Sequence, residues 1–153
     1  MSSLPGALLG LLAASLAACE SPLSPTELCA LARAEARWAA RGFENYVIEE
    51  RQACFCPAEV TQWARVEVLS GKVDRVTVVE SGVEVPAAQR GGFPTVEQVF
   101  RTIRTGSTQD WVNDVVADFD PQLGFPTLVS LIPKPGVLDA GITYYFRHAS
   151  RLP

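Results

Sequence analysis

This sequence has little of what nucleic-acid-binding surfaces and common catalytic sites require. In 153 residues, 13 are Lys or Arg and 17 are Asp or Glu, so the formal net charge is −4. A mildly acidic chain argues against binding to nucleic acid, because phosphates are held by basic surfaces. The chain has one histidine, His148, and neither a glycine-rich phosphate loop nor the Gly-x-Ser-x-Gly turn of hydrolases. We therefore expect no cofactor, and a non-catalytic role is favoured over an enzymatic one.

Charge is also missing from the apolar N-terminus, where residues 4–18 are mainly Leu, Ala and Gly. This stretch is too short for a helix that crosses about 30 Å of hydrocarbon, which needs roughly 20 apolar residues. It fits the core of a secretory signal, although residues 1–3 supply no Lys or Arg. Leu16-Ala17-Ala18-Cys19 follows the pattern of a lipobox, which predicts lipidation of Cys19 and removal of residues 1–18. The alternative is an ordinary secretory leader.

Lipidation of Cys19 would put the protein in a bacterial cell envelope, with the membrane contacted through the lipid. Glu20 is not the Asp of the inner-membrane retention signal, so we expect an outer-membrane anchor and a domain that faces the periplasm. Residues 19–25 contain two prolines and would form a short extended tether. Residues 26–153 are expected to form a single domain.

Two helices are predicted from their capping signals. Ser24 to Glu27 form a capping box with proline at the first helical position, and Gly42 ends the apolar repeat that follows. A second capping box, Thr95 to Gln98, opens a helix that ends before Gly106.

Three strands are predicted after each helix, from apolar and polar residues that alternate. The first three are residues 46–51, 64–68 and 73–79, and the last three are residues 112–119, 125–132 and 142–147. Residues 82–92 are expected to be a loop. Helix-strand-strand-strand occurring twice predicts an α+β domain with two helices packed on one face of an antiparallel sheet.

With these elements assigned, the chain resembles a family of uncharacterised bacterial lipoproteins that is defined only as a domain of unknown function. The resemblance covers about residues 38–146 and depends mainly on Cys54-Phe55-Cys56 and on Asp120-x-x-x-Gly124-Phe125-Pro126-Thr127. Two features depart from the family pattern: Cys29 is an additional cysteine, and Pro133 stands where an Asp is expected. The resemblance implies the fold and the location, and it implies no activity.

Cys54 and Cys56 are the main candidates for chemistry, because exported thiols tend to oxidise. If Cys19 is acylated, three cysteines remain and one of them stays unpaired. A bond between Cys54 and Cys56 would need a kink at Pro57, since in a strand their Cα atoms would lie about 6.6 Å apart, near the upper limit for a disulfide. A bond from Cys29 to either one would instead staple helix to sheet and contribute about 3 kcal/mol.

A structural disulfide is the favoured role for these cysteines, and two others stay open. A redox-active pair would need a lowered thiol pKa, and Arg51 is the nearest basic residue. Binding of a soft metal such as Cu(I) or Zn by Cys29, Cys54 and Cys56 would have no second histidine or methionine cluster to help.

The remaining candidates have simpler structural explanations. His148 lies near the chain end, where a surface position is expected. Asp118 and Asp120 suit the solvated face and the turn of a hairpin better than a carboxylate pair or a Ca²⁺ site. Three tryptophans are expected to pack in or around the core rather than stack on a ligand: Trp38, Trp63 and Trp111.

The leading hypothesis is therefore a lipid-anchored, non-catalytic envelope module that binds a protein or peptide partner with one sheet face or edge. The alternative is a thiol–disulfide redox or soft-metal-handling protein that acts through Cys54 and Cys56. A hydrolase would need Asp118, Asp120 or His148 to line a pocket.

Overall fold

The computed structural model of the chain describes residues 23–106 and 108–153. The expected leader at residues 1–18, the expected lipidation site Cys19 and most of the tether lie outside these residues.

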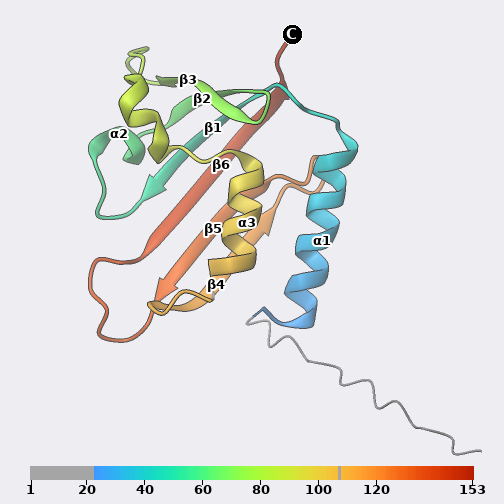
Figure 1. Cartoon of the computed structure of the whole chain (residues 1–153), viewed down its shortest axis with the longest axis vertical. Helices are drawn as coiled ribbons and strands as arrows, with labels where there is room; N and C mark the ends of the chain where they lie inside the picture. Colours follow the sequence, from blue (N-terminus) through green and yellow to red (C-terminus); the bar gives the residue numbers. More distant parts are fainter. Residues whose placement is uncertain (1–22, 107) are drawn as a thin grey trace, which may run out of the picture.

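Six strands form one antiparallel sheet with the order β3-β2-β1-β6-β5-β4 (Figure 1). The α+β class predicted from the sequence is confirmed, with the sheet as the larger part. The strands are β1 (Tyr46–Ala53), β2 (Ala64–Leu69), β3 (Lys72–Val78), β4 (Val112–Phe119), β5 (Pro126–Pro133) and β6 (Ile142–Arg151).

The sheet consists of two three-stranded meanders joined by β1 and β6. Within each meander, strands that follow one another in sequence are paired, as the turns between them favour. At the centre, β1 pairs with β6, so that Glu50 lies opposite Phe146. The first strand of one half therefore meets the last strand of the other, and equivalent strands do not occupy equivalent places in the sheet.

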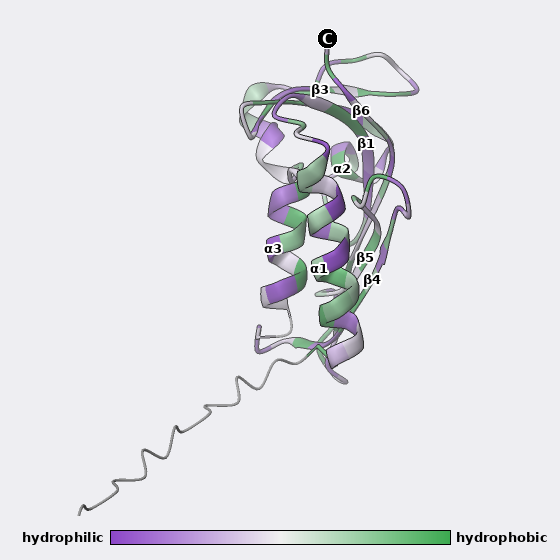
Figure 2. Cartoon of the chain, turned by 90° about the vertical axis from the view of Figure 1, so that its right-hand side faces the viewer, coloured by the Kyte–Doolittle hydropathy of each residue, from purple (hydrophilic) through white to green (hydrophobic). Residues whose placement is uncertain are grey.

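Two long helices begin at the predicted capping boxes. In α1 (Pro25–Ala40), Ser24 and Glu27 exchange the two hydrogen bonds of the motif. Before α3 (Val96–Gly106), the Thr95 hydroxyl accepts from the backbone of Gln98, and the Gln98 side chain accepts from the backbone of Thr95. Figure 2 draws both helices beside each other on the same side of the sheet.

Two short elements were not predicted: α2 (Ala58–Thr61) and the 3-10 helix η1 (Ala87–Gly92). Both have proline at the N-cap, and each is too short to show an apolar period. Because η1 falls within residues 82–92, part of the expected loop is helical. Gly92, at the end of η1, lies against Val60 of α2, where an added Cβ would come within 2.9 Å of a Val60 methyl group.

The core lies on the helix-covered face of the sheet, and Trp38 is one of its large buried side chains. The Trp38 ring meets Phe43, Tyr46 and Phe125 edge-on, with centroids 5.0–6.3 Å apart. Its indole nitrogen donates to Glu97 of α3, and so does the Tyr46 hydroxyl. Burial, together with the Glu97 charge, raises the pKa of Tyr46. Two partly buried hydrogen bonds to Glu97 thus join α1 and β1 to α3.

Candidate functional site

The structure pairs Cys54 with Cys56 and leaves Cys29 as an exposed free thiol on α1. Of the pairings that the sequence left open, the small ring is the one formed. The staple between Cys29 and the sheet is absent from the described residues. Cys19, the expected lipid-bearing cysteine, lies outside them.

The small disulfide ring of Cys54 and Cys56 can form because β1 ends at Ala53, the residue before Cys54. In extended backbone the two Cα atoms would lie about 6.6 Å apart, but the chain bends after Ala53 and brings them to 5.2 Å, within the usual range of a disulfide. Pro57 follows and opens α2. We call Cys54, Phe55 and Cys56 the cystine loop.

Phe55 is the most exposed large apolar residue among the described residues, with 88% of its surface accessible. Its two neighbours are bonded to each other, so the loop has little freedom to fold the ring back onto the protein. In the sequence, Phe55 stands out only as the middle residue of the Cys54-Phe55-Cys56 motif. The signal that would have identified it is an aromatic residue held between two bonded cysteines at the end of a strand.

A shallow hollow of about 370 Å³ lies beside the cystine loop. It is bounded by β1, α2 and η1. The Gln52 side chain of β1 donates a hydrogen bond to the carbonyl oxygen of Gly92 in η1, and both residues line the hollow. Its lining residues are Gln52, Cys56, Pro57, Glu59, Val60, Gln89 and Gly92. The hollow has the volume of a small-ligand pocket but is open to solvent.

On the face of the sheet opposite the helices, two arginines stack on aromatic rings. The Arg51 guanidinium lies 5.3 Å from the Trp63 ring centroid and 4.6 Å from that of Tyr145, and the Arg147 guanidinium lies 3.9 Å from Trp63. All are within the range of cation–π attraction. We call these four residues the arginine stack. Trp63 is thus not a core residue, whereas Trp38 is buried as expected.

The register of β6 explains why two of its consecutive residues reach one carboxylate. A bulge places an extra residue in β6 opposite Ile48, and His148 adopts a φ of +56°. Consequently Arg147 Nε and His148 Nδ1 both contact Glu49 Oε2, at 2.8 and 3.2 Å. Partial burial raises the pKa of Glu49, but hydrogen bonds from these two side chains outweigh it and keep that pKa below its usual value.

The helix-covered face of the sheet carries a buried carboxylate, Glu50, whose pKa is shifted in the opposite direction to that of Glu49. Glu50 is 1% exposed, and neither of its carboxyl oxygens has a hydrogen-bond partner among the described residues. Burial raises the pKa of Glu50 well above its ordinary value. Tyr144 lies near it, and its own pKa is raised by burial and then by the Glu50 charge. Glu50 was not among the residues predicted from the sequence to form a site.

The structure does not assemble the other polar candidates into a site. The Asp120 carboxylate accepts from the backbone of Gln122 and Leu123, which makes it a turn cap. Asp118 is exposed on β4, and His148 is exposed on β6. Within residues 23–106 and 108–153, no group of three or more His, Cys, Asp or Glu side chains is placed to hold a metal ion.

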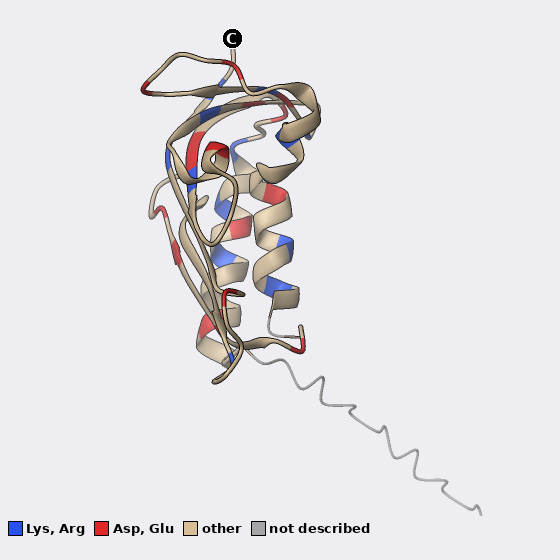
Figure 3. Cartoon of the chain, turned by 90° about the vertical axis from the view of Figure 1, so that its left-hand side faces the viewer, with Lys and Arg blue, Asp and Glu red and all other residues tan. Residues whose placement is uncertain are grey.

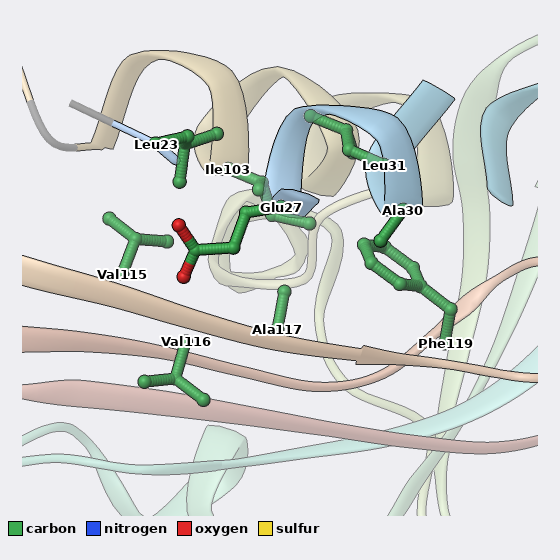
Figure 4. A pocket seen from close by; sticks show the side chains of 9 residues that line it. All are labelled: Leu23, Glu27, Ala30, Leu31, Ile103, Val115, Val116, Ala117 and Phe119. Atoms are coloured by element: carbon green, nitrogen blue, oxygen red, sulfur yellow. The ribbon is translucent and has the colours of Figure 1, made fainter. Parts of the chain in front are cut away.

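A second hollow lies between the start of α1 and the edge strand β4 (Figure 4). Its volume is about 100 Å³, well below the roughly 300–1,000 Å³ of typical ligand pockets. Mainly apolar side chains line it: Leu23, Glu27, Ala30, Leu31, Ile103, Val115, Val116, Ala117 and Phe119. We interpret it as an imperfection in helix–sheet packing.

No helix in the described part of the chain is both long enough and apolar enough to cross a membrane. Acidic and basic residues are interspersed along the helices and strands (Figure 3).

Comparison with known proteins identifies a family and no function. A family model described as a family of unknown function, DUF6174, matches residues 30–151, a range that includes the cystine loop and the arginine stack. No curated protein and no solved structure matches the chain. The expected resemblance to a domain of unknown function is confirmed, and the match does not address lipidation. The chain therefore belongs to DUF6174, a family of unknown function.

Proposed function

We propose that this protein is a lipid-anchored cell-envelope module that binds a protein partner through the cystine loop and catalyses no reaction. The observation that carries the proposal is Phe55, an 88% exposed aromatic side chain presented by a disulfide-closed loop. Buried aromatic anchors supply much of the energy of protein interfaces. A loop that is already rigid also loses less conformational freedom on binding than a flexible one.

The surroundings of Phe55 suit a binding surface. The hollow lined by Gln52, Cys56 and Val60 offers space for a partner side chain next to the loop. On the other face of β1, Arg51 and Trp63 lie in cation–π contact, and both are residue types enriched at interfaces. In this proposal α1 and α3 pack together on one face of the sheet, and the opposite face stays open to a partner.

The anchor is the second part of the proposal. After removal of residues 1–18, lipid chains on Cys19 would hold the mature protein in the outer membrane, facing the periplasm. Cys19 and Pro25, where α1 begins, are six positions apart in the sequence, so the domain would lie within about 20 Å of its lipid attachment. Mass spectrometry of the protein from its native envelope tests this part directly: a mature N-terminus at acylated Cys19 supports it, and an intact Met1 overturns it.

Photocrosslinking tests the binding part. A benzophenone amino acid is placed at Phe55 in one variant and at Leu138 in a control, because Leu138 is similarly exposed, at 85%. Irradiation of intact cells is expected to give one discrete adduct from position 55 and none from position 138. Equal adduct patterns at the two positions would contradict a specific surface at the cystine loop.

A thiol–disulfide function is the second candidate, because Cys54 and Cys56 are bonded to each other. In such a reaction the pair would accept two electrons and two protons from a substrate dithiol, which would become a disulfide. Its test is the reduction potential of the pair. A value well below about −300 mV, typical of inert structural disulfides, would exclude it. The soft-metal version would require both thiols to be reduced.

A further inference from the structure

Arg51 is a partly buried cation that forms no ion pair with any described residue. Among the described residues, its side chain makes neither a hydrogen bond nor a salt bridge, and its Nε atom is buried without a partner. The neighbouring carboxylates on the same face are already paired. Glu49 is held by Arg147, and Glu67 lies 3.9 Å from Arg65.

No other basic residue of the described chain has this combination of burial and isolation. Arg41 and Arg151 donate to backbone carbonyls, and five arginines form salt bridges. The basic side chains that remain without a partner are all exposed to solvent: Arg33, Arg37, Lys72, Arg101 and Lys134.

The two rings beside Arg51 hold its guanidinium in place. Tyr145 lies opposite Arg51 in the pairing of β1 with β6, and Trp63 immediately precedes the residue that pairs with Glu50 on the other side. Both rings lie within cation–π distance of the guanidinium carbon, and none of the guanidinium N–H groups donates to an acceptor among the described residues. Planar, fixed donors of this kind match the two oxygens of a carboxylate.

We propose that Arg51 binds a carboxylate of the partner, so that the segment docked on the cystine loop contains an Asp or Glu beside the residue that contacts Phe55. This inference deepens the proposed function and rests on it. Arg51 and Phe55 are four residues apart, so at most about 13 Å of extended chain separates them. Four or five residues of an extended partner segment span that distance.

The test uses the mature lipoprotein, purified in detergent, and a phage-displayed library of random 12-residue peptides. Peptides that bind the wild-type protein are resynthesised with each acidic residue replaced by its amide. We expect the amide form of one position to bind about tenfold more weakly, as for loss of a charge-assisted hydrogen bond. In Arg51→Gln the acidic and amide forms should bind equally.

Two further variants make the test specific. Arg65→Gln is the matched control, because Arg65 is an exposed arginine of β2 on the same face, and it should keep the tenfold preference. Arg51→Lys keeps the charge but loses the planar fork, and it should retain part of the preference. Circular dichroism melting of each variant establishes that the fold is intact.

The outcomes separate this inference from the proposed function. If Phe55→Ala abolishes binding but the acidic preference is absent, or persists in Arg51→Gln, the inference is wrong and the proposed function stands. If inorganic phosphate binds wild type but not Arg51→Gln, and the selected peptides show no acidic preference, a small-anion site replaces the inference. If the selected peptides bind Phe55→Ala as well as wild type, the proposed function is wrong.

Discussion

Glu49 and Glu50 are consecutive residues of β1, and they occupy opposite faces of the same sheet. Glu49 lies on the open face, receives hydrogen bonds from Arg147 and His148, and has a lowered pKa. Glu50 lies on the covered face with no hydrogen-bond partner among the described residues, and burial raises its pKa. The open face therefore stabilises the charged form of a carboxylate, and the covered face favours the neutral form. On the sheet, the open face is therefore the one that can present charged side chains to a partner.

The largest expected effect distinguishes two tryptophans that differ in the face they occupy. Trp38→Ala should lower the free energy of unfolding by about 4 kcal/mol, because it removes a large buried side chain from the core and a hydrogen-bond donor to Glu97. Trp63→Ala should cost only about 1 kcal/mol, mainly through lost cation–π contacts on the open face. Urea denaturation measures both, and equal losses would contradict the assignment of the two faces.

Glu50 gives the next largest effect. Glu50→Leu should raise the free energy of unfolding at pH 7 by about 2 kcal/mol, because it removes a buried polar group that has no partner. The folded pKa is raised, so the stability from protonated Glu50 is fully present below the unfolded pKa of about 4.3. It is lost as the pH rises through the folded pKa.

The isosteric control Glu50→Gln should remove this pH dependence while keeping the side-chain shape. Thermal melts of wild type and both variants between pH 4 and pH 8 measure it. If wild type and Glu50→Gln show the same slope in that window, Glu50 is not the buried acid described above.

The cystine loop should contribute less to stability than the core does. Replacing Cys54 and Cys56 together by serine should lower the free energy of unfolding by roughly 1.6 kcal/mol, because the closed loop has only three residues. Equilibrium denaturation of the oxidised wild type and the double variant gives this value. A loss of more than about 4 kcal/mol in the free energy of unfolding would mean that the cystine loop is part of the core. It would contradict the view that the loop lies at the edge of the domain and presents Phe55 to a partner.

Glu49 is expected to have the smallest effect. Glu49→Gln should lower stability at pH 7 by about 0.5 kcal/mol, since Arg147 and His148 are both substantially exposed and solvent screens the pairs. Because the folded pKa of Glu49 is lowered, this contribution is present above the unfolded pKa and is lost as the pH falls through the folded pKa. Thermal melts should therefore show a stability difference between wild type and Glu49→Gln at pH 7 and a smaller one at pH 3. The same difference at both pH values would contradict the pairing of Glu49 with Arg147 and His148.

Local signals in the sequence predicted the two long helices and the six strands, but not how distant strands pair. Capping boxes gave the starts of α1 and α3, and alternation gave the six strands. The pairing of β1 with β6 joins residues about a hundred positions apart, for which a single sequence carries no signal. β6 also continues to Arg151, beyond the predicted end at residue 147, because the bulge at His148 keeps the later residues in register with β1.

The candidate site was predicted only in part, for identifiable reasons. The sequence singled out Cys54 and Cys56, but the choice between the small ring and a bond to Cys29 depends on where β1 ends. Alternation could not say which of Glu49 and Glu50 is buried, since apolar residues precede both. The arginine stack requires β2, β1 and β6 to be neighbours, which is a property of the whole sheet.

The affinity of the partner crosslinked at Phe55 tests the central claim most directly. Its dissociation constant is measured for wild type, Phe55→Ala and the exposed control Leu138→Ala. We predict at least about 30-fold weaker binding by Phe55→Ala, as for an interface hot spot, and no change for Leu138→Ala. Wild-type affinity in Phe55→Ala would contradict the account.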